Sequence, residues 1–149
     1  MKKILFSVAI VMCVFVLTGC GSNKTLQCSK DFSSSMPYGI KMVQDSTINF
    51  KGNKVDTMDM VMTFEIPSTY ASMASTITSS MQSTYESQYG KYDGITVKLN
   101  KISDLKFEIV ISIDYENISD TTKKAIGAVG SESYSVNRKQ LENQGYTCK

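Results

Sequence analysis

The strongest constraint on the fold is the regular alternation of residues 55–66. One side of this segment is apolar and the other is polar, with Val61 as the exception. The apolar side consists of Met58, Met60, Met62, Phe64 and Ile66, and the polar side of Thr57, Asp59, Thr63 and Glu65. A period of two residues is that of a β-strand with one buried face and one face in water. The chain must therefore supply a second layer that covers the apolar face.

Other segments supply the remaining strands and that second layer. Leu26 and Cys28 indicate a first strand, and similar alternation predicts strands over 40–50, 95–99 and 107–115. Apolar residues at helical spacing from Tyr70 predict a helix that is capped by Ser68, runs to Tyr89 and ends at Gly90. Short helices are expected over 119–129 and, after Ser135, over 136–143. The fold class is α+β: an antiparallel sheet of four to five strands, one long helix packed on one face and one or two short C-terminal helices.

The N-terminal segment has the form of an export signal. Lys2 and Lys3 precede the uncharged segment Ile4–Leu17, which as a helix measures about 21 Å and is short for a bilayer core of about 30 Å. The next residues, Leu17-Thr18-Gly19-Cys20, resemble the bacterial lipobox. The expected organisation is a signal peptide over 1–19, a lipidated Cys20 with a short tether over 20–25, and a single α+β domain over 26–149.

The lipobox resemblance implies a location for the mature chain. Cleavage before Cys20 and attachment of diacylglycerol to its thiol would give the protein two acyl chains, which anchor a protein stably. The domain would then lie on the extracytoplasmic face of the cell membrane. The alternative is a simple secretory signal that a cysteine happens to follow.

Charge and composition exclude several classes of function. The chain has 16 Lys and Arg against 14 Asp and Glu, and removal of Lys2 and Lys3 with the signal leaves 14 against 14. A nucleic-acid binder needs a basic surface, so no nucleic-acid partner is expected. The chain has no histidine, which excludes histidine-based nucleophile activation and histidine-ligated zinc.

Two cysteines remain for a disulfide bond. Cys13 lies in the signal segment and Cys20 is assigned to lipid, which leaves Cys28 and Cys148. An exported compartment permits disulfides, so the sequence predicts a Cys28–Cys148 bridge. The alternative is a pair of free buried thiols.

The Met58, Met60 and Met62 series is the sharpest candidate for chemistry. Three thioethers on one side of a strand are soft ligands that suit Cu(I), so one hypothesis is a copper-handling lipoprotein. The stronger interpretation is core packing, because Phe64 and Ile66 continue the same face. Metal and cofactor are therefore not expected.

Two further groups of side chains have alternative interpretations. Asp114 and Glu116 alternate on the polar side of their strand, where carboxylates keep a sheet face solvated more often than they act as an acid–base pair. Tyr85, Tyr89 and Tyr92 cluster at the end of the long helix, where they either pack or line a ligand groove between helix and sheet.

The layout as a whole resembles small bacterial lipoproteins of the YehR-like kind. The resemblance lies in the lipobox, the early Cys28, the hairpin at Gly52, the long helix and the terminal Tyr146-Thr147-Cys148. It implies a location and a fold type and no catalytic residues. The expectation is a non-enzymatic domain that binds an envelope protein or a small ligand.

Overall fold

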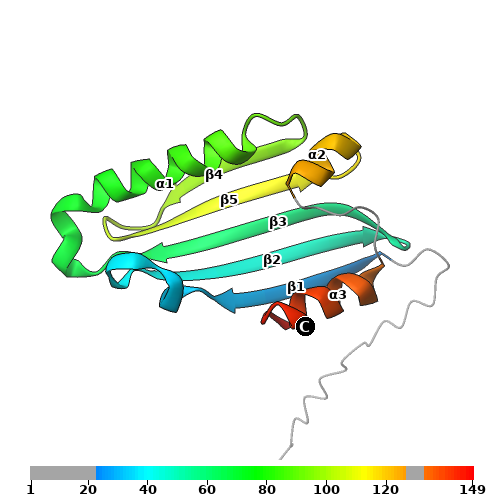
Figure 1. The fold of residues 1–149 in the computed structure, drawn as a ribbon, viewed down its shortest axis with the longest axis horizontal. Helices are drawn as coiled ribbons and strands as arrows, with labels where there is room; N and C mark the ends of the chain where they lie inside the picture. The colour runs from blue at the N-terminus through cyan, green and yellow to red at the C-terminus, as the bar shows by residue number, and fades with distance from the viewer. Residues whose placement is uncertain (1–22, 127–132) are drawn as a thin grey trace, which may run out of the picture.

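The protein folds around one six-stranded antiparallel sheet with its helices on one side (Figure 1). The computed structural model describes residues 23–126 and 133–149. The strands follow the spatial order β4-β5-β3-β2-β1-β6, and every pair is antiparallel. Their bounds are β1 Lys24–Asp31, β2 Lys41–Lys51, β3 Lys54–Glu65, β4 Ile95–Lys101, β5 Lys106–Asp114 and β6 Thr147–Cys148.

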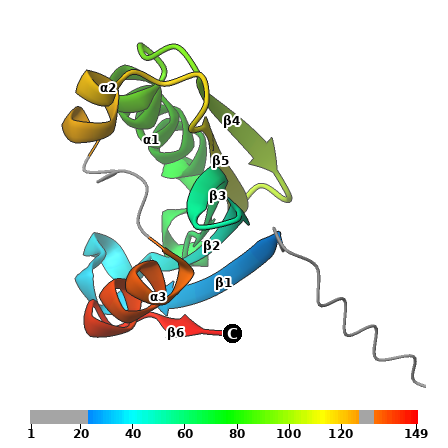
Figure 2. The ribbon, with the colours of Figure 1, turned by 90° about the vertical axis from the view of Figure 1, so that its right-hand side faces the viewer.

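The helices are unevenly distributed over the sheet. The long helix α1 (Ala74–Tyr89) packs over β4 and β5, and α3 (Tyr134–Asn143) packs over β1 and β6 at the opposite edge. The short α2 (Asp120–Ala125) follows β5 near the end of α1. Seen along the strands, all three helices lie on the same side of the sheet (Figure 2). The two central strands, β3 and β2, thus lie between the strands that α1 and α3 contact most.

The predicted alternation of the central strand is confirmed, and its register extends across the sheet. Met58 lies opposite Ile48 of β2 and Ile113 of β5, and Met60 lies opposite Ser46 and Ile111. Directly opposite residues share a face, so each methionine continues a row of side chains that crosses the sheet. Farther along, the rings of Phe64 and Phe107 stack with centroids 4.9 Å apart, and both are almost completely buried.

The long helix begins later than its apolar spacing predicts. Residues Ser68–Met73 form 3-10 turns, and the α-helix starts at Ala74. Ser68 makes no side-chain capping bond, which corrects the expected cap. A 3-10 turn advances three residues per turn and not 3.6, so Met73 does not join the apolar stripe and is 52% exposed. Ile77, Met81 and Tyr85 do pack on the core, and the helix ends before Gly90 as expected.

The C-terminal helices also differ in their bounds from the sequence interpretation. Ser119 caps α2, because its hydroxyl accepts a hydrogen bond of 3.0 Å from the backbone N–H of Thr122. The part of this helix expected over 127–129 lies outside the described residues. Helix α3 starts at Tyr134 and not after Ser135, and the ring of Tyr134 packs edge-on against Phe50, with centroids 5.6 Å apart.

The Cys28–Cys148 disulfide is confirmed, and it accounts for the extra strand. The sequence interpretation treats Tyr146–Cys148 as an extended tail, whereas Thr147 and Cys148 pair with Ser29 and Cys28 as a sixth strand. Two residues are too few for an alternation signal, so this strand is defined by pairing alone. The first strand also begins at Lys24, inside the segment expected to be tether.

A lysine holds the C-terminal end of α3 against the same edge. The Lys30 ammonium donates a hydrogen bond to the backbone carbonyl of Gln144 and lies over the rings of Phe32 and Tyr146, at 4.7 and 5.5 Å from their centroids. A cation at a helix C-terminus satisfies a free carbonyl and complements the helix dipole.

In the described ranges, no helix is both long and apolar enough to cross a bilayer.

Removal of the disulfide tests how much the bridge stabilises the domain. We expect Cys28→Ser with Cys148→Ser to lower the free energy of unfolding by about 2–4 kcal/mol, because the bridge closes a long loop in the unfolded chain. Urea unfolding of the oxidised domain measures this difference. In reducing buffer the wild-type domain should fall to the stability of the double variant. Equal stability of both proteins in both buffers would contradict the prediction.

Candidate functional site

A cavity of about 210 Å³ lies on the helical side of the sheet, between the end of α1 and helix α3. We call it the interhelical cavity. Its floor is formed by sheet residues and its walls by residues of α1, α2, α3 and the end of β5. The lining residues are Ile48, Val55, Met58, Met60, Tyr89, Ile113, Tyr115, Ile126, Asn137, Gln140, Leu141 and Gln144.

Two residues of the cavity floor are methionines of β3, Met58 and Met60. Met58 and Met60 are half-buried, whereas Met62, two residues farther along β3, is 4% exposed and belongs to the core under α1. The alternation of β3 aims all three thioethers at the same side, and only the position of the helices decides which of them reach the cavity. Methionine is flexible and polarizable, so it suits a surface that must adapt to a guest.

One wall of the cavity carries the hydroxyl of Tyr115. The Tyr115 hydroxyl lies 4.0 Å from the Met58 sulfur, and burial raises the pKa of Tyr115 above its usual value. Asn137 and Gln140 of α3 and Gln144, which follows it, also line the cavity. The side chains that line the cavity in the described ranges are therefore apolar or uncharged at neutral pH. Such a lining favours an uncharged guest, which binds by apolar contact and a few hydrogen bonds.

The three tyrosines at the end of α1 all pack against the core, as the packing interpretation predicts, and two of them also line hollows. Tyr89 contributes to the interhelical cavity, and its ring stacks on that of Tyr85 with centroids 6.3 Å apart. Tyr85 lines a second hollow of about 320 Å³ along α1, together with Met36, Phe64 and Met81. Burial, and to a lesser degree Tyr89, raises the pKa of Tyr85. Tyr92 packs against the core and lines neither hollow.

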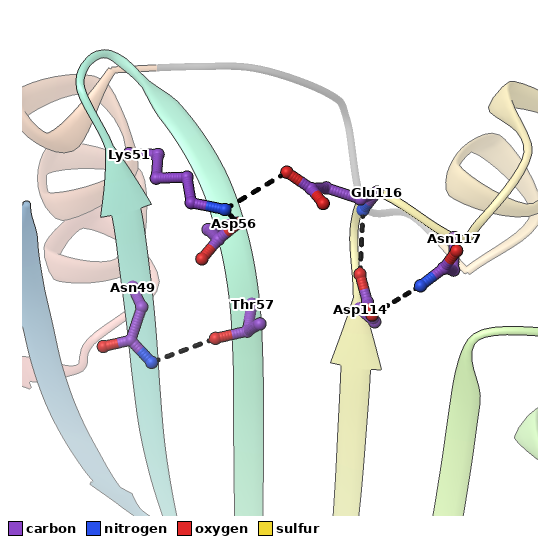
Figure 3. Close-up of polar contacts among 7 residues, drawn as sticks. All are labelled: Asn49, Lys51, Asp56, Thr57, Asp114, Glu116 and Asn117. Carbon is purple, nitrogen blue, oxygen red and sulfur yellow. Dashed lines mark hydrogen bonds and ion pairs between the residues drawn. The ribbon is translucent and has the colours of Figure 1, made fainter.

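The two carboxylates at the end of β5 serve separate structural partners (Figure 3). Asp114 accepts hydrogen bonds from the Asn117 amide at 2.7 Å and from the Glu116 backbone N–H at 3.0 Å. Glu116 instead pairs with Lys51 at 3.3 Å, and Lys51 also pairs with Asp56 at 3.1 Å. The hydrogen bond from Asn117 holds the pKa of Asp114 below its usual value. Asp114 stabilises the turn that follows β5, and Glu116 belongs to the ion-pair network of Lys51. The two carboxylates therefore do not form an acid–base pair.

The remaining site predictions have different outcomes. Cys28 and Cys148 form the predicted bridge. Cys20 and the lipobox lie outside the described residues. In residues 23–126 and 133–149, no cluster of three or more histidine, cysteine, aspartate or glutamate side chains is placed to hold a metal ion. The interhelical cavity was missed by sequence reasoning, because its walls come from four elements whose spacing only the tertiary packing fixes.

Comparison with known proteins adds information about the fold. No family model and no curated protein matches the chain. The structure is similar to the NMR structure of a protein from Streptococcus pneumoniae TIGR4, with a TM-score of 0.58 and 10% sequence identity. The match covers 100% of this chain and 98% of the streptococcal chain. At this identity the likeness shows a shared fold.

Acidification tests the role assigned to Asp114. Because the folded state lowers the pKa of this carboxyl, its stabilising effect is present above the unfolded-state pKa of about 3.9 and is lost as the pH falls through the lower folded-state value. We therefore expect Asp114→Asn to destabilise the domain more at about pH 7 than at about pH 2. Urea midpoints at the two pH values measure this effect. The matched control is Asp45→Asn on the open face of the sheet, and an equal response of both variants would contradict the prediction.

Proposed function

We propose that this protein is a membrane-anchored, extracytoplasmic lipoprotein whose folded domain binds a partner or small ligand without catalysing a reaction. Three features support the anchoring part of the proposal. The lipobox and the element layout resemble small YehR-like lipoproteins. The Cys28–Cys148 bridge is typical of an exported protein. The first strand begins at Lys24, so only a short tether separates the domain from Cys20.

The interhelical cavity is the observation that carries the binding part of the proposal. Apolar cavities of about 150 Å³ in other proteins accept benzene, so a volume of about 210 Å³ has room for one ring or one short branched group. The amides of Gln140 and Gln144 can hydrogen-bond a polar edge of such a group. The guest is therefore an uncharged small molecule, or an apolar side chain presented by an envelope protein.

Replacement of the lipobox cysteine tests the anchor. We expect Cys20→Ala to abolish incorporation of labelled fatty acid and to block cleavage, because no other side chain offers a thiol at the cleavage site. Intact mass and acyl labelling of the purified full-length product measure both effects. Cys13→Ala, which alters the signal segment alone, should leave both unchanged. Undiminished acylation of the Cys20→Ala protein would contradict the proposal.

Blocking the cavity tests the binding site. Titration with an uncharged ring compound such as indole should shift the methyl NMR signals of Met58 and Met60 and leave that of the distant Met73 unchanged. Gln140→Trp places a large ring at the exposed rim, so we expect it to weaken binding at least about tenfold, equivalent to about 1.4 kcal/mol. Lys139→Trp is the matched control, because Lys139 lies on the same helix and outside the cavity lining. Equal binding by both variants would contradict the assignment.

The second candidate function is copper handling, favoured by the two thioethers on the cavity floor. Met58 and Met60 both line the cavity, and Met62 lies next along the same face of β3. Titration of the domain with Cu(I) alone separates this function from the first. Met58→Leu with Met60→Leu nearly conserves volume and removes both sulfurs, and Met42→Leu is the control. Affinity weaker than about 1 μM in the wild-type domain would eliminate copper handling.

A further inference from the structure

Three exposed lysines surround the end of the sheet at which the chain enters the domain. Lys24 begins β1, Lys54 begins β3 after the hairpin turn, and Lys124 lies in α2. The register joins the first two, because Lys24 lies opposite Phe50 and Lys54 lies opposite the next residue, Lys51. Helix α2 lies toward this same end in Figure 1. We call this surface the hairpin end.

Some of the lysines at the hairpin end form ion pairs and others do not. Lys51 is engaged by Asp56 and Glu116 (Figure 3), and Lys123 lies 3.6 Å from Asp120. In the described part of the chain, Lys24, Lys54 and Lys124 make no ion pair. Lys24 instead lies over the Tyr134 ring, 5.8 Å from its centroid. Asp56 and Glu116 share one lysine, so this network leaves one negative charge over, against the three positive charges of Lys24, Lys54 and Lys124.

The hairpin end is also hollowed. A cavity of about 440 Å³ is lined by Lys51, Lys54, Val55, Asp56, Tyr115, Glu116 and Lys123. Lys54 and Lys123 reach this hollow from different elements, a strand and a helix. Among the described residues that line this hollow, Lys54 is the lysine without an ion pair, and as a point charge at the rim it suits a phosphate group. Val55 and Tyr115 line the interhelical cavity as well, so the two hollows adjoin.

The tether fixes which end of the domain lies near the membrane. Cys20 precedes Lys24 by four residues, and a fully extended chain of that length spans at most about 14 Å. The 12-residue strand β3 is about 36 Å long at ~3.3 Å per residue, so the opposite end of the sheet lies well beyond that reach. A lipid on Cys20 therefore keeps the lysines within contact distance of the bilayer surface. This step rests on the lipidation proposed above.

We propose that the hairpin end docks on the anionic headgroups of the membrane, with Lys24, Lys54 and Lys124 binding lipid phosphates and the sheet standing away from the bilayer. Tethering raises the effective concentration of headgroups at this surface, so three lysines suffice without a large net charge. Docking also holds the interhelical cavity close to the headgroup layer. A guest of that cavity would then be drawn from the membrane surface.

Amine modification of the lipidated protein tests the docking. Full-length protein, with lipid on Cys20 verified by intact mass, is bound to vesicles of phosphatidylglycerol with phosphatidylcholine, or of phosphatidylcholine alone. A membrane-impermeant acetylating reagent then modifies exposed lysines, and peptide mass spectrometry measures the rate at each one. We expect Lys24, Lys54 and Lys124 to react about fivefold more slowly on the anionic vesicles, the factor that one lysine–headgroup contact provides. Lys98 and Lys106, which lie away from the hairpin end, should react at equal rates on both.

Charge-reversal variants separate headgroup binding from mere proximity. Lys54→Glu with Lys124→Glu should return the rate at Lys24 to its value on neutral vesicles. The matched control, Lys98→Glu with Lys106→Glu, changes the net charge equally and should leave the protection of Lys24 intact. Uniform reactivity of all lysines, or equal protection on both vesicle types, would overturn the docking and leave the lipid anchor standing. A chain without lipid on Cys20 would refute both proposals.

Discussion

The structure depends on the in-register apolar rows that cross the sheet from β1 to β4. Each row combines one side chain from each strand, as in the series Leu26, Ile48, Met58, Ile113 and Ile95. Burial of these rows is the main favourable contribution to folding, at roughly 25 cal/mol for each Å² of apolar surface removed from water. The helices are weak on their own, because α1 is rich in serine and threonine, which have modest helix propensity. They are stabilised because their apolar side chains pack against the apolar face of the sheet.

The helices cover the sheet in two separate regions, and the interhelical cavity lies where these regions meet. Helix α1 closes one core over β3, β4 and β5, while α3 and the tail close a second, smaller core of Leu26, Cys28, Ile48 and Phe50. The disulfide and the Lys30 contacts hold the second cover in place. Between the two covers, Met58 and Met60 remain partly accessible. A cavity thus arises between the two covered regions, next to a strand, β3, that is apolar along one face.

Local pattern predicted the elements well wherever it was long. The alternation of residues 55–66 and 107–115 and the stripe on α1 placed the main strands, the helix and its end at Gly90. The errors fall at short or mixed segments. Met73 shares the helical spacing of the stripe and yet points outward, because the chain before Ala74 winds as 3-10 turns. The sixth strand has two residues, and α3 starts two residues earlier than expected, at Tyr134, whose ring packs on Phe50. None of these features has a local signature.

The sequence by itself determined that residues 55–66 form a strand, which face of that strand is buried, and which pair of cysteines is available for a bridge. These properties follow from a period of two and from a count of thiols, which need no knowledge of the partners. Only the tertiary structure decided which two of three methionines line a cavity and that Asp114 and Glu116 serve separate contacts. It also decided that, among the described residues, Lys51 forms ion pairs and Lys54 does not. The physical reason is that each of these outcomes depends on the distance between elements far apart in the chain. That distance is fixed by packing and not by the spacing of residues along the sequence.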